Sequence, residues 1–218
     1  MTRPDLAGGH PLPHRIAGLP VPQDDVSAAA WRWAGRGLPA YLLAHSVRTY
    51  CWGATLAAGE GWRFDRRILW TASLLHDVGL TRLPRVRTCF EVEGAEVARR
   101  FLRRHGMSAG DADRAAEAIV LHMQPGVTLA NGVEAVLLDQ ATSIDVRGDG
   151  YERNATSRDA VVRAFPRGAF DRHFLAAIGR EALRRPTCQS ARLLHEGDLA
   201  GWMARSPWRQ DRGHRPPG

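Results

Sequence analysis

The segment Leu74–Thr81 (LLHDVGLT) limits most strongly what this chain can fold into. An imidazole and a carboxylate, His76 and Asp77, stand side by side at the end of an apolar helical pattern, and Gly79 follows. Ionisable side chains are seldom fully buried unless they are paired or bind a metal. Adjacent helical residues are about 100° apart around the helix axis, so both side chains reach one point only where the helix ends at a cavity. The dipeptide alone is compatible with two metal ligands or with a hydrogen-bonded pair that ties down a helix end.

Apolar residues recur at three- and four-residue spacings along most of the chain, and no stretch shows the alternation of a half-buried strand. Asp65 is a capping residue, and Gly59 and Gly79 are expected to end helices, Gly79 in the left-handed conformation. We therefore expect an all-α fold, a single-domain helical bundle without internal repeats. The expected helices span approximately residues 25–34, 40–58, 66–78, 90–104, 111–122, 133–146, 157–164 and 167–185.

The length and composition are sufficient for one domain with a substantial core, because 44% of the 218 residues are hydrophobic. We expect this domain to span residues 24–208. Residues 1–23 are rich in proline and glycine and are expected to form an extended arm. Residues 209–218 are expected to be a disordered tail. The arm has no apolar centre, so it does not resemble a secretory signal, and the chain has no apolar run long enough to cross a membrane.

Charge and cysteine content indicate the partners and the compartment. The net charge is +7, but every basic residue is arginine, and the arginines are dispersed over the expected helices. Solvated helix faces explain this pattern better than a nucleic-acid surface does. Cys51, Cys89 and Cys188 are odd in number and lack metal-site spacing, so we interpret them as reduced thiols of a cytoplasmic protein. The expected partner is a small-molecule substrate, with no nucleic acid and no membrane; a homo-oligomer is left open.

Further ionisable residues lie on the apolar sides of the expected helices. His45 shares a face with aromatic and aliphatic residues, and His122 ends an apolar stripe before Pro125. Asp145 lies on the buried side near the end of its helix, where the helix dipole and desolvation both oppose its charge, so a cation is needed there. One such residue is typical of a core. Their number on successive helices favours a shared metal site.

The order His45…His76-Asp77…Asp145 resembles the signature of the HD domain superfamily of metal-dependent hydrolases. The resemblance covers about residues 38–185. The surrounding segments His45–Tyr50 (HSVRTY), Leu75–Gly79 (LHDVG), Phe90–Ala95 (FEVEGA) and Ala118–His122 (AIVLH) resemble the cyanamide-hydratase-like branch of that superfamily.

This resemblance implies a metal site formed by His45, His76, Asp77 and Asp145, with Asp77 also contributing to catalysis. Two histidines and two aspartates suit one divalent ion, Zn²⁺ first, with Fe²⁺, Mn²⁺ and Co²⁺ as alternatives. Four protein ligands leave room for water, whose pKa the metal lowers to give a hydroxide. In a hydratase this hydroxide would attack the carbon of a small nitrile or cyanamide and give an amide or urea.

Other residues are expected to assist. His122 is the candidate to orient the substrate or supply a proton, because the ordinary pKa of histidine lies near working pH. Glu91 is a second candidate for proton transfer or for support of a ligand, although an acid favoured by the helix dipole is an equal interpretation. Thr49, Trp52 and Phe90 are candidates to line a substrate pocket, although each could serve core packing alone.

Three alternatives remain open. In an HD phosphohydrolase acting on a nucleotide or phosphate ester, arginines could hold phosphate, but Leu80 occupies the position about a turn after the pair where the nucleotidases carry an acid. A dinuclear iron oxygenase would need a second partner for His122, and only His105 is available. A scaffold without activity is disfavoured because every expected ligand position is filled. The candidate phosphate-binding arginines are Arg48, Arg82, Arg85 and Arg87.

Overall fold

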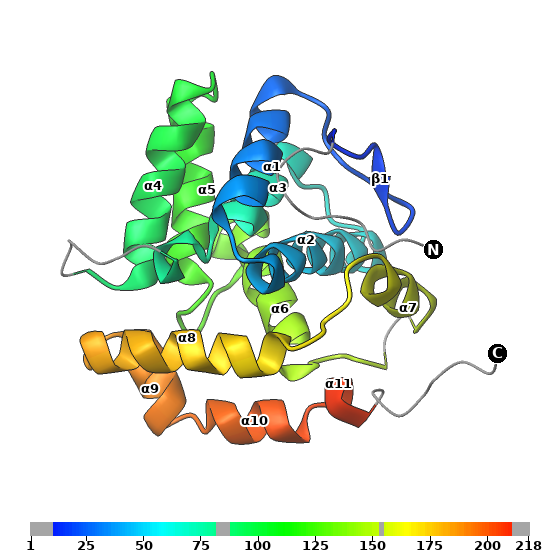
Figure 1. The fold of residues 1–218 in the computed structure, drawn as a ribbon. Helices are drawn as coiled ribbons and strands as arrows, with labels where there is room; N and C mark the ends of the chain where they lie inside the picture. Colours follow the sequence, from blue (N-terminus) through cyan, green and yellow to red (C-terminus); the bar gives the residue numbers. More distant parts are fainter. Residues whose placement is uncertain (1–10, 82–87, 153–154, 211–218) are drawn as a thin grey trace.

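The computed structural model describes residues 11–81, 88–152 and 155–210, with the side chains of 209 and 210 excepted. The all-α prediction is confirmed: helices dominate the described residues, and a two-residue hairpin is the only sheet among them (Figure 1). The hairpin pairs β1 (Arg15–Ile16) antiparallel with β2 (Leu19–Pro20). The helices are α1 (Asp25–Gly37), α2 (Ala40–Glu60), α3 (Arg66–Leu75), α4 (Phe90–Arg104), α5 (Ala109–Leu121), α6 (Val133–Arg147), α7 (Ala155–Ala164), α8 (Phe170–Arg184), α9 (Gln189–His195), α10 (Leu199–Arg205) and α11 (Pro207–Gln210), with 3-10 turns η1 (Val78–Leu80) and η2 (Leu129–Asn131).

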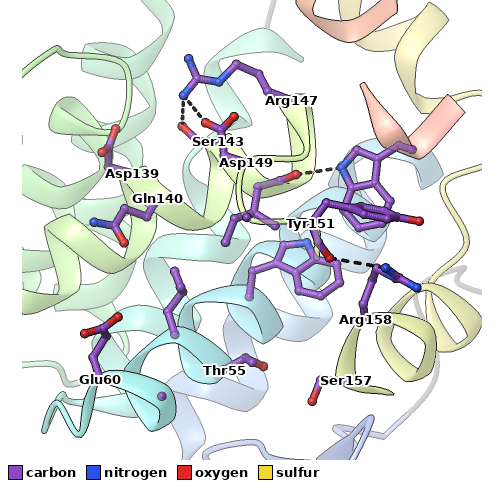
Figure 2. A pocket seen from close by; sticks show the side chains of 16 residues that line it. Thr55, Glu60, Asp139, Gln140, Ser143, Arg147, Asp149, Tyr151, Ser157 and Arg158 are labelled. Atoms are coloured by element: carbon purple, nitrogen blue, oxygen red, sulfur yellow. Dashed lines mark hydrogen bonds and ion pairs between the residues drawn. The ribbon is translucent and has the colours of Figure 1, made fainter. Parts of the chain in front are cut away.

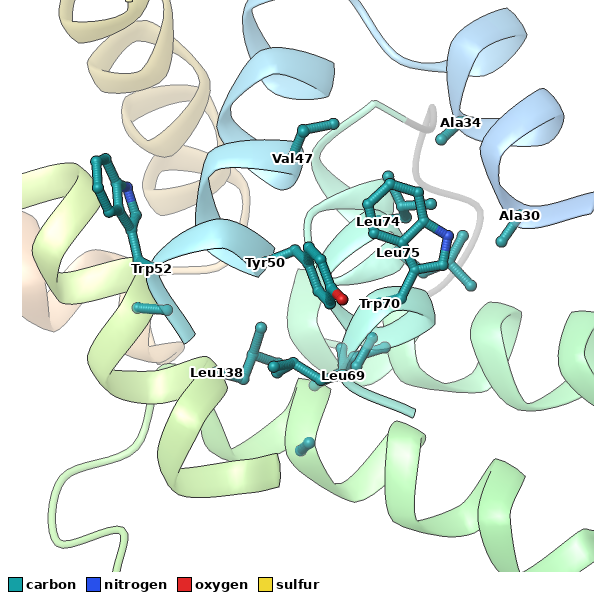
Figure 3. Packing of buried hydrophobic residues seen from close by; sticks show 14 of the residues in the cluster. Ala30, Ala34, Val47, Tyr50, Trp52, Leu69, Trp70, Leu74, Leu75 and Leu138 are labelled. Carbon is teal, nitrogen blue, oxygen red and sulfur yellow. The ribbon is translucent and has the colours of Figure 1, made fainter. Parts of the chain in front are cut away.

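Helix α2 is the centre of the fold, and it packs against α3, α6 and α8. Helices α4 and α5 lie side by side on one flank, and α8, α9 and α10 lie together below α2 and α6 in the view of Figure 1. The core between α1, α2 and α3 is aromatic: the rings of Tyr50 and Trp70 meet edge to face, with centroids 4.9 Å apart (Figure 3). The N–H of Trp70 donates to the carbonyl of Ser27 on α1. These contacts fix α3, and the His-Asp pair follows directly after its last residue, Leu75.

Residues 11–23 pack against the domain. Ile16 and Val21 are each 4% exposed and belong to the hydrophobic core. The Tyr50 hydroxyl on α2 donates to the Pro20 carbonyl over 2.5 Å. Residues 1–10 and 211–218, which include most of the predicted tail, lie outside the described residues.

Two predicted helix ends are wrong. Helix α2 continues through Gly59 to Glu60, and Gly61 adopts the left-handed conformation with φ 68°. Helix α3 ends at Leu75, and Gly79 lies inside η1 without a positive φ. A Cβ at Gly79 would overlap the backbone carbonyl of Phe90, so close approach of two chain segments explains this glycine. The resulting contact holds η1 against the start of α4.

The expectation of three reduced thiols is also wrong. Cys89 and Cys188 form a disulfide across 99 residues, and Cys51 alone remains free and buried. The spacing of the cysteines along the sequence could not reveal this pair. The two residues meet only because the fold brings the start of α4 next to the start of α9. The cytoplasmic location stays a prediction.

No helix among the described residues is long and apolar enough to cross a membrane.

Candidate metal centre

His45 on α2 and the pair His76 and Asp77 after α3 bring their ligand atoms to one point. Nε2 of His45 lies 3.2 Å from Nε2 of His76. Oδ2 of Asp77 lies 3.6 Å from the first nitrogen and 3.3 Å from the second. Each of the three residues is only 1% exposed. The chain leaves the helix at this pair, which lets adjacent side chains reach the same point.

Hydrogen bonds behind the two imidazoles determine which nitrogens face the cluster. Nδ1 of His76 lies 2.8 Å from the Ser73 carbonyl, and Nδ1 of His45 lies 2.7 Å from Oδ2 of Asp145. A carbonyl and an ionised carboxylate can only accept, so each Nδ1 donates, and in the neutral form of each ring Nε2 presents a lone pair. Oδ2 of Asp77 is buried and has no hydrogen-bond partner. Two lone pairs and one orphaned carboxylate oxygen fit the donor set of a divalent metal.

The electrostatics keep Asp77 ionised. Burial alone would raise the pKa of Asp77, but the neighbouring imidazole of His76 outweighs it and lowers the pKa to about 2. Burial opposes a charge on His76, yet the Asp77 carboxylate raises its pKa overall. Burial lowers the pKa of His45. Metal binding requires an ionised carboxylate and neutral imidazoles, and near neutral pH the carboxylate and His45 already meet that requirement.

Asp145 lies behind His45 and is completely buried. Its Oδ2 is on the Nδ1 side of the ring, whereas the cluster is on the Nε2 side. Its remaining contacts come from Arg48, Trp52 and Arg167. Burial would raise its pKa, but the guanidinium groups of Arg48 and Arg167 hold that pKa well below the usual range. Asp145 thus contacts the Nδ1 side of His45, apart from the three converging ligand atoms, and its expected role as a metal ligand stays a prediction.

His122 follows α5 and lies beside the cluster. Its Nε2 is 3.9 Å from Oδ1 of Asp77, and its ring meets that of His76 edge to face. Its Nδ1 donates to the Ile119 carbonyl, which leaves Nε2 as an acceptor. Burial lowers the pKa of His122 to about 3, and His76 adds to this effect. The imidazole is therefore neutral, which argues against the proton-donor role expected from the ordinary histidine pKa.

A cavity of about 80 Å³ adjoins these residues. His45, His76, Asp77 and His122 form its polar floor. Helix α6 contributes one wall. Helices α9 and α10, which the sequence pattern does not predict, contribute Leu193, Leu199 and Trp202 to the lining. The further lining residues are Met123, Thr142, Ser143, Val146, Arg147, Phe174, Ile178, Leu193, Leu199 and Trp202.

The other candidate residues lie outside this cavity lining. Glu91 is 2% exposed in the first turn of α4, where burial raises its pKa and one carboxylate oxygen lacks a partner. Phe90 packs edge-on against His122, with ring centroids 6.0 Å apart. Thr49 is fully buried on α2. Trp52 donates its N–H to Oδ1 of Asp145 over 2.9 Å, so it supports the site from behind.

Of the arginines considered for phosphate binding, Arg48 alone lies among the described residues. Arg48 is completely buried and pairs with Asp145, so it is not accessible to a ligand. Arg82, Arg85 and Arg87 lie outside the described residues. His105 is exposed at the end of α4, and its Nδ1 forms a hydrogen bond with the Phe101 carbonyl. Helical spacing could have identified Arg48 as a neighbour of His45, because Arg48 follows His45 by three residues and so shares its helix face.

A model of the HD domain matches residues 42–163, more than half of the chain. The chain belongs to the HD domain family. The matched segment contains His45, the His76-Asp77 pair, His122 and Asp145. HD domain proteins are mostly metal-dependent hydrolases, and the buried His-His-Asp cluster could hold a metal. No curated protein matches the chain.

Proposed function

We propose that this HD domain protein is a metal-dependent hydratase or hydrolase that adds water to a small, weakly charged substrate such as a nitrile or cyanamide. The main support is the orphaned Oδ2 of Asp77, which meets two histidine lone pairs at the floor of a cavity of about 80 Å³. The sequence resemblance to the cyanamide-hydratase-like branch favours the same class.

We assign His45, His76 and Asp77 as the protein ligands of one divalent metal, zinc before iron, manganese or cobalt. When bound, such a metal lowers the pKa of water enough to supply a nucleophile near neutral pH. Asp145 then acts through His45: it accepts a hydrogen bond from Nδ1–H and fixes the ring with Nε2 toward the cavity.

We assign to His122 the role of orienting the attacking water. Its Nε2 carries a lone pair because Nδ1 donates to Ile119. A neutral imidazole at this position accepts a hydrogen bond from water and directs a lone pair of the water oxygen toward the substrate carbon.

Ser143 is the candidate to donate to the substrate nitrogen. It lines the cavity, and its oxygen accepts a hydrogen bond from Nη2 of Arg147 over 3.0 Å. Its own proton is therefore free to reach the nitrogen on which negative charge develops, as an oxyanion-hole donor does.

The apolar part of the cavity lining favours substrates without a large charged group. Phe174, Ile178, Leu193 and Leu199 offer no hydrogen bonds. The arginine that lines the cavity, Arg147, already binds Asp149 and Ser143. A phosphate ester would therefore enter without a free cation among the described lining residues, and this favours a hydratase over a phosphohydrolase.

The test is a direct assay of the zinc-reconstituted protein with cyanamide, following urea. We expect urea formation that falls by about 10²-fold in Ser143→Ala, the loss typical for one oxyanion-hole donor. The control is Ser157→Ala, which alters a partly exposed serine that does not line this cavity. Hydrolysis of p-nitrophenyl phosphate without urea formation would instead establish a phosphohydrolase.

A further inference from the structure

A second cavity of about 480 Å³ lies beyond α6, between α2, the start of α7 and Trp208 (Figure 2). Its volume is typical of a site for a small organic molecule. Ser143 and Arg147 line both this cavity and the smaller cavity beside His45, His76 and Asp77. One turn of α6 therefore forms a wall that the two cavities share. The proposed reaction makes no use of the larger space.

One side of this second cavity is aromatic. The rings of Trp208 and Tyr151 meet edge to face with centroids 4.8 Å apart, and Trp52 lies 5.7 Å from Trp208. The N–H of Trp208 donates to the Ile144 carbonyl, and that of Trp52 donates to Asp145. Both indole donors are thus occupied within the protein. Each tryptophan is only 5% exposed, so a ligand in the cavity meets the edge of ring surface that they leave in its lining.

The positive charges in the cavity are already compensated. Arg147 binds Asp149 over 2.5 Å. Arg158 pairs with Asp159 over 3.0 Å, and its guanidinium stacks 4.2 Å from the centroid of the Tyr151 ring. An anionic ligand would therefore have to displace an existing pair.

The carboxylates on the opposite side have no direct partner among the described residues, although Arg147 acts on Asp139 through its charge. Figure 2 shows Asp139, Gln140 and Glu60 along one side of the cavity, away from Tyr151 and Arg158. Among the described residues, neither carboxylate has a hydrogen bond or an ion pair. Asp139 is half-buried, and burial raises its pKa to about 6. A partly desolvated carboxylate without a partner favours an incoming cation.

We propose that this second cavity binds a small organic ammonium ion with an aromatic body. The ammonium group lies against Asp139 and Glu60, with the side-chain oxygen of Gln140 as a further acceptor, and the ring packs on Tyr151 and Trp208. A charge-assisted hydrogen bond at one end and ring contacts at the other select both parts of such a ligand. This site is separate from the metal cluster and does not depend on the proposed reaction.

Isothermal titration of the full-length protein with 2-phenylethylammonium tests the proposal. The neutral analogue 2-phenylethanol and the anion 3-phenylpropionate have similar shapes and report the contribution of charge. We expect binding of the amine, binding of the alcohol at least about tenfold weaker, and no binding of the carboxylate.

Variants then locate the site. Asp139→Asn should weaken amine binding about tenfold, and Tyr151→Leu about threefold, with alcohol binding unaffected by the first change. The matched control is Glu117→Gln, an exposed acid on α5 without an ion pair among the described residues. Equal binding of the alcohol and the amine, unchanged amine binding in Asp139→Asn, or no binding of any probe would overturn the proposal.

Discussion

Arg48 binds both carboxylate oxygens of Asp145: Nε lies 2.7 Å from Oδ1 and Nη2 lies 2.7 Å from Oδ2. Both side chains are completely buried. The sequence indicates that a cation must accompany Asp145, and the structure supplies a guanidinium one turn along α2 from His45. The ion pair therefore holds the carboxylate that orients His45.

Removing Arg48 should be strongly destabilising. Arg48→Met leaves Asp145 buried with weaker compensation, and we expect a loss of about 3–5 kcal/mol in the free energy of unfolding. The double variant Arg48→Met with Asp145→Leu should be more stable than the single variant, because no orphaned carboxylate remains. Urea denaturation measures both, with Arg99→Met in an exposed ion pair as the control, expected to lose less than about 1 kcal/mol. A loss below about 1 kcal/mol for Arg48→Met would contradict this assignment.

The disulfide should contribute measurably to stability. Cys89→Ser with Cys188→Ser releases a loop of about 100 residues in the unfolded chain, and we expect a loss of about 2–5 kcal/mol. Alkylation of the denatured, unreduced wild-type protein should modify Cys51 alone. Modification of all three cysteines under these conditions would show that the bridge is absent.

Gly79 should tolerate no side chain. A Cβ there overlaps the Phe90 carbonyl, so Gly79→Ala must push η1 away from α4. We expect a loss of about 1–3 kcal/mol. Gly110→Ala on α5 is the matched control, because nothing lies within 4 Å of its added Cβ. That control should be neutral or stabilising by up to about 1 kcal/mol. Equal thermal midpoints for the two variants would be inconsistent with this contact.

Asp139 should give stability a particular pH dependence. Burial raises its pKa from 3.8 to about 6, so the folded protein holds this proton more tightly than the unfolded chain does. The resulting contribution to stability is fully present below about pH 4 and is lost as the pH rises through about 6. The free energy of unfolding of wild type minus that of Asp139→Asn should therefore decrease between pH 4 and pH 7. Urea titrations at four pH values measure it, and a constant difference would refute the raised pKa.

The helical class and most helices could be predicted because apolar periodicity is local. Helix ends were less predictable: Gly59 and Gly79 are typical breakers, yet one lies inside α2 and the other serves a contact with Phe90. The disulfide and the ion pair of Arg48 with Asp145 join residues about 100 positions apart. No spacing rule reaches that far.

The cluster itself was partly foreseeable. His45, His76 and Asp77 could be chosen because ionisable residues on apolar faces need a partner. The position of Asp145 behind His45 could not, since periodicity indicates burial but not which ring nitrogen a carboxylate meets. The covering helices α9 and α10 were missed because they are short.

The most direct test of the account is the metal content of protein purified without added metal or chelator, measured for wild type, His76→Ala and His105→Ala. The first variant removes an assigned ligand, and the second removes an exposed histidine as the matched control. We predict about one divalent metal per chain in wild type and His105→Ala, and a loss of at least about tenfold in His76→Ala. Undiminished metal in His76→Ala, two irons per chain, or no metal even after reconstitution would contradict a mononuclear centre at His45, His76 and Asp77.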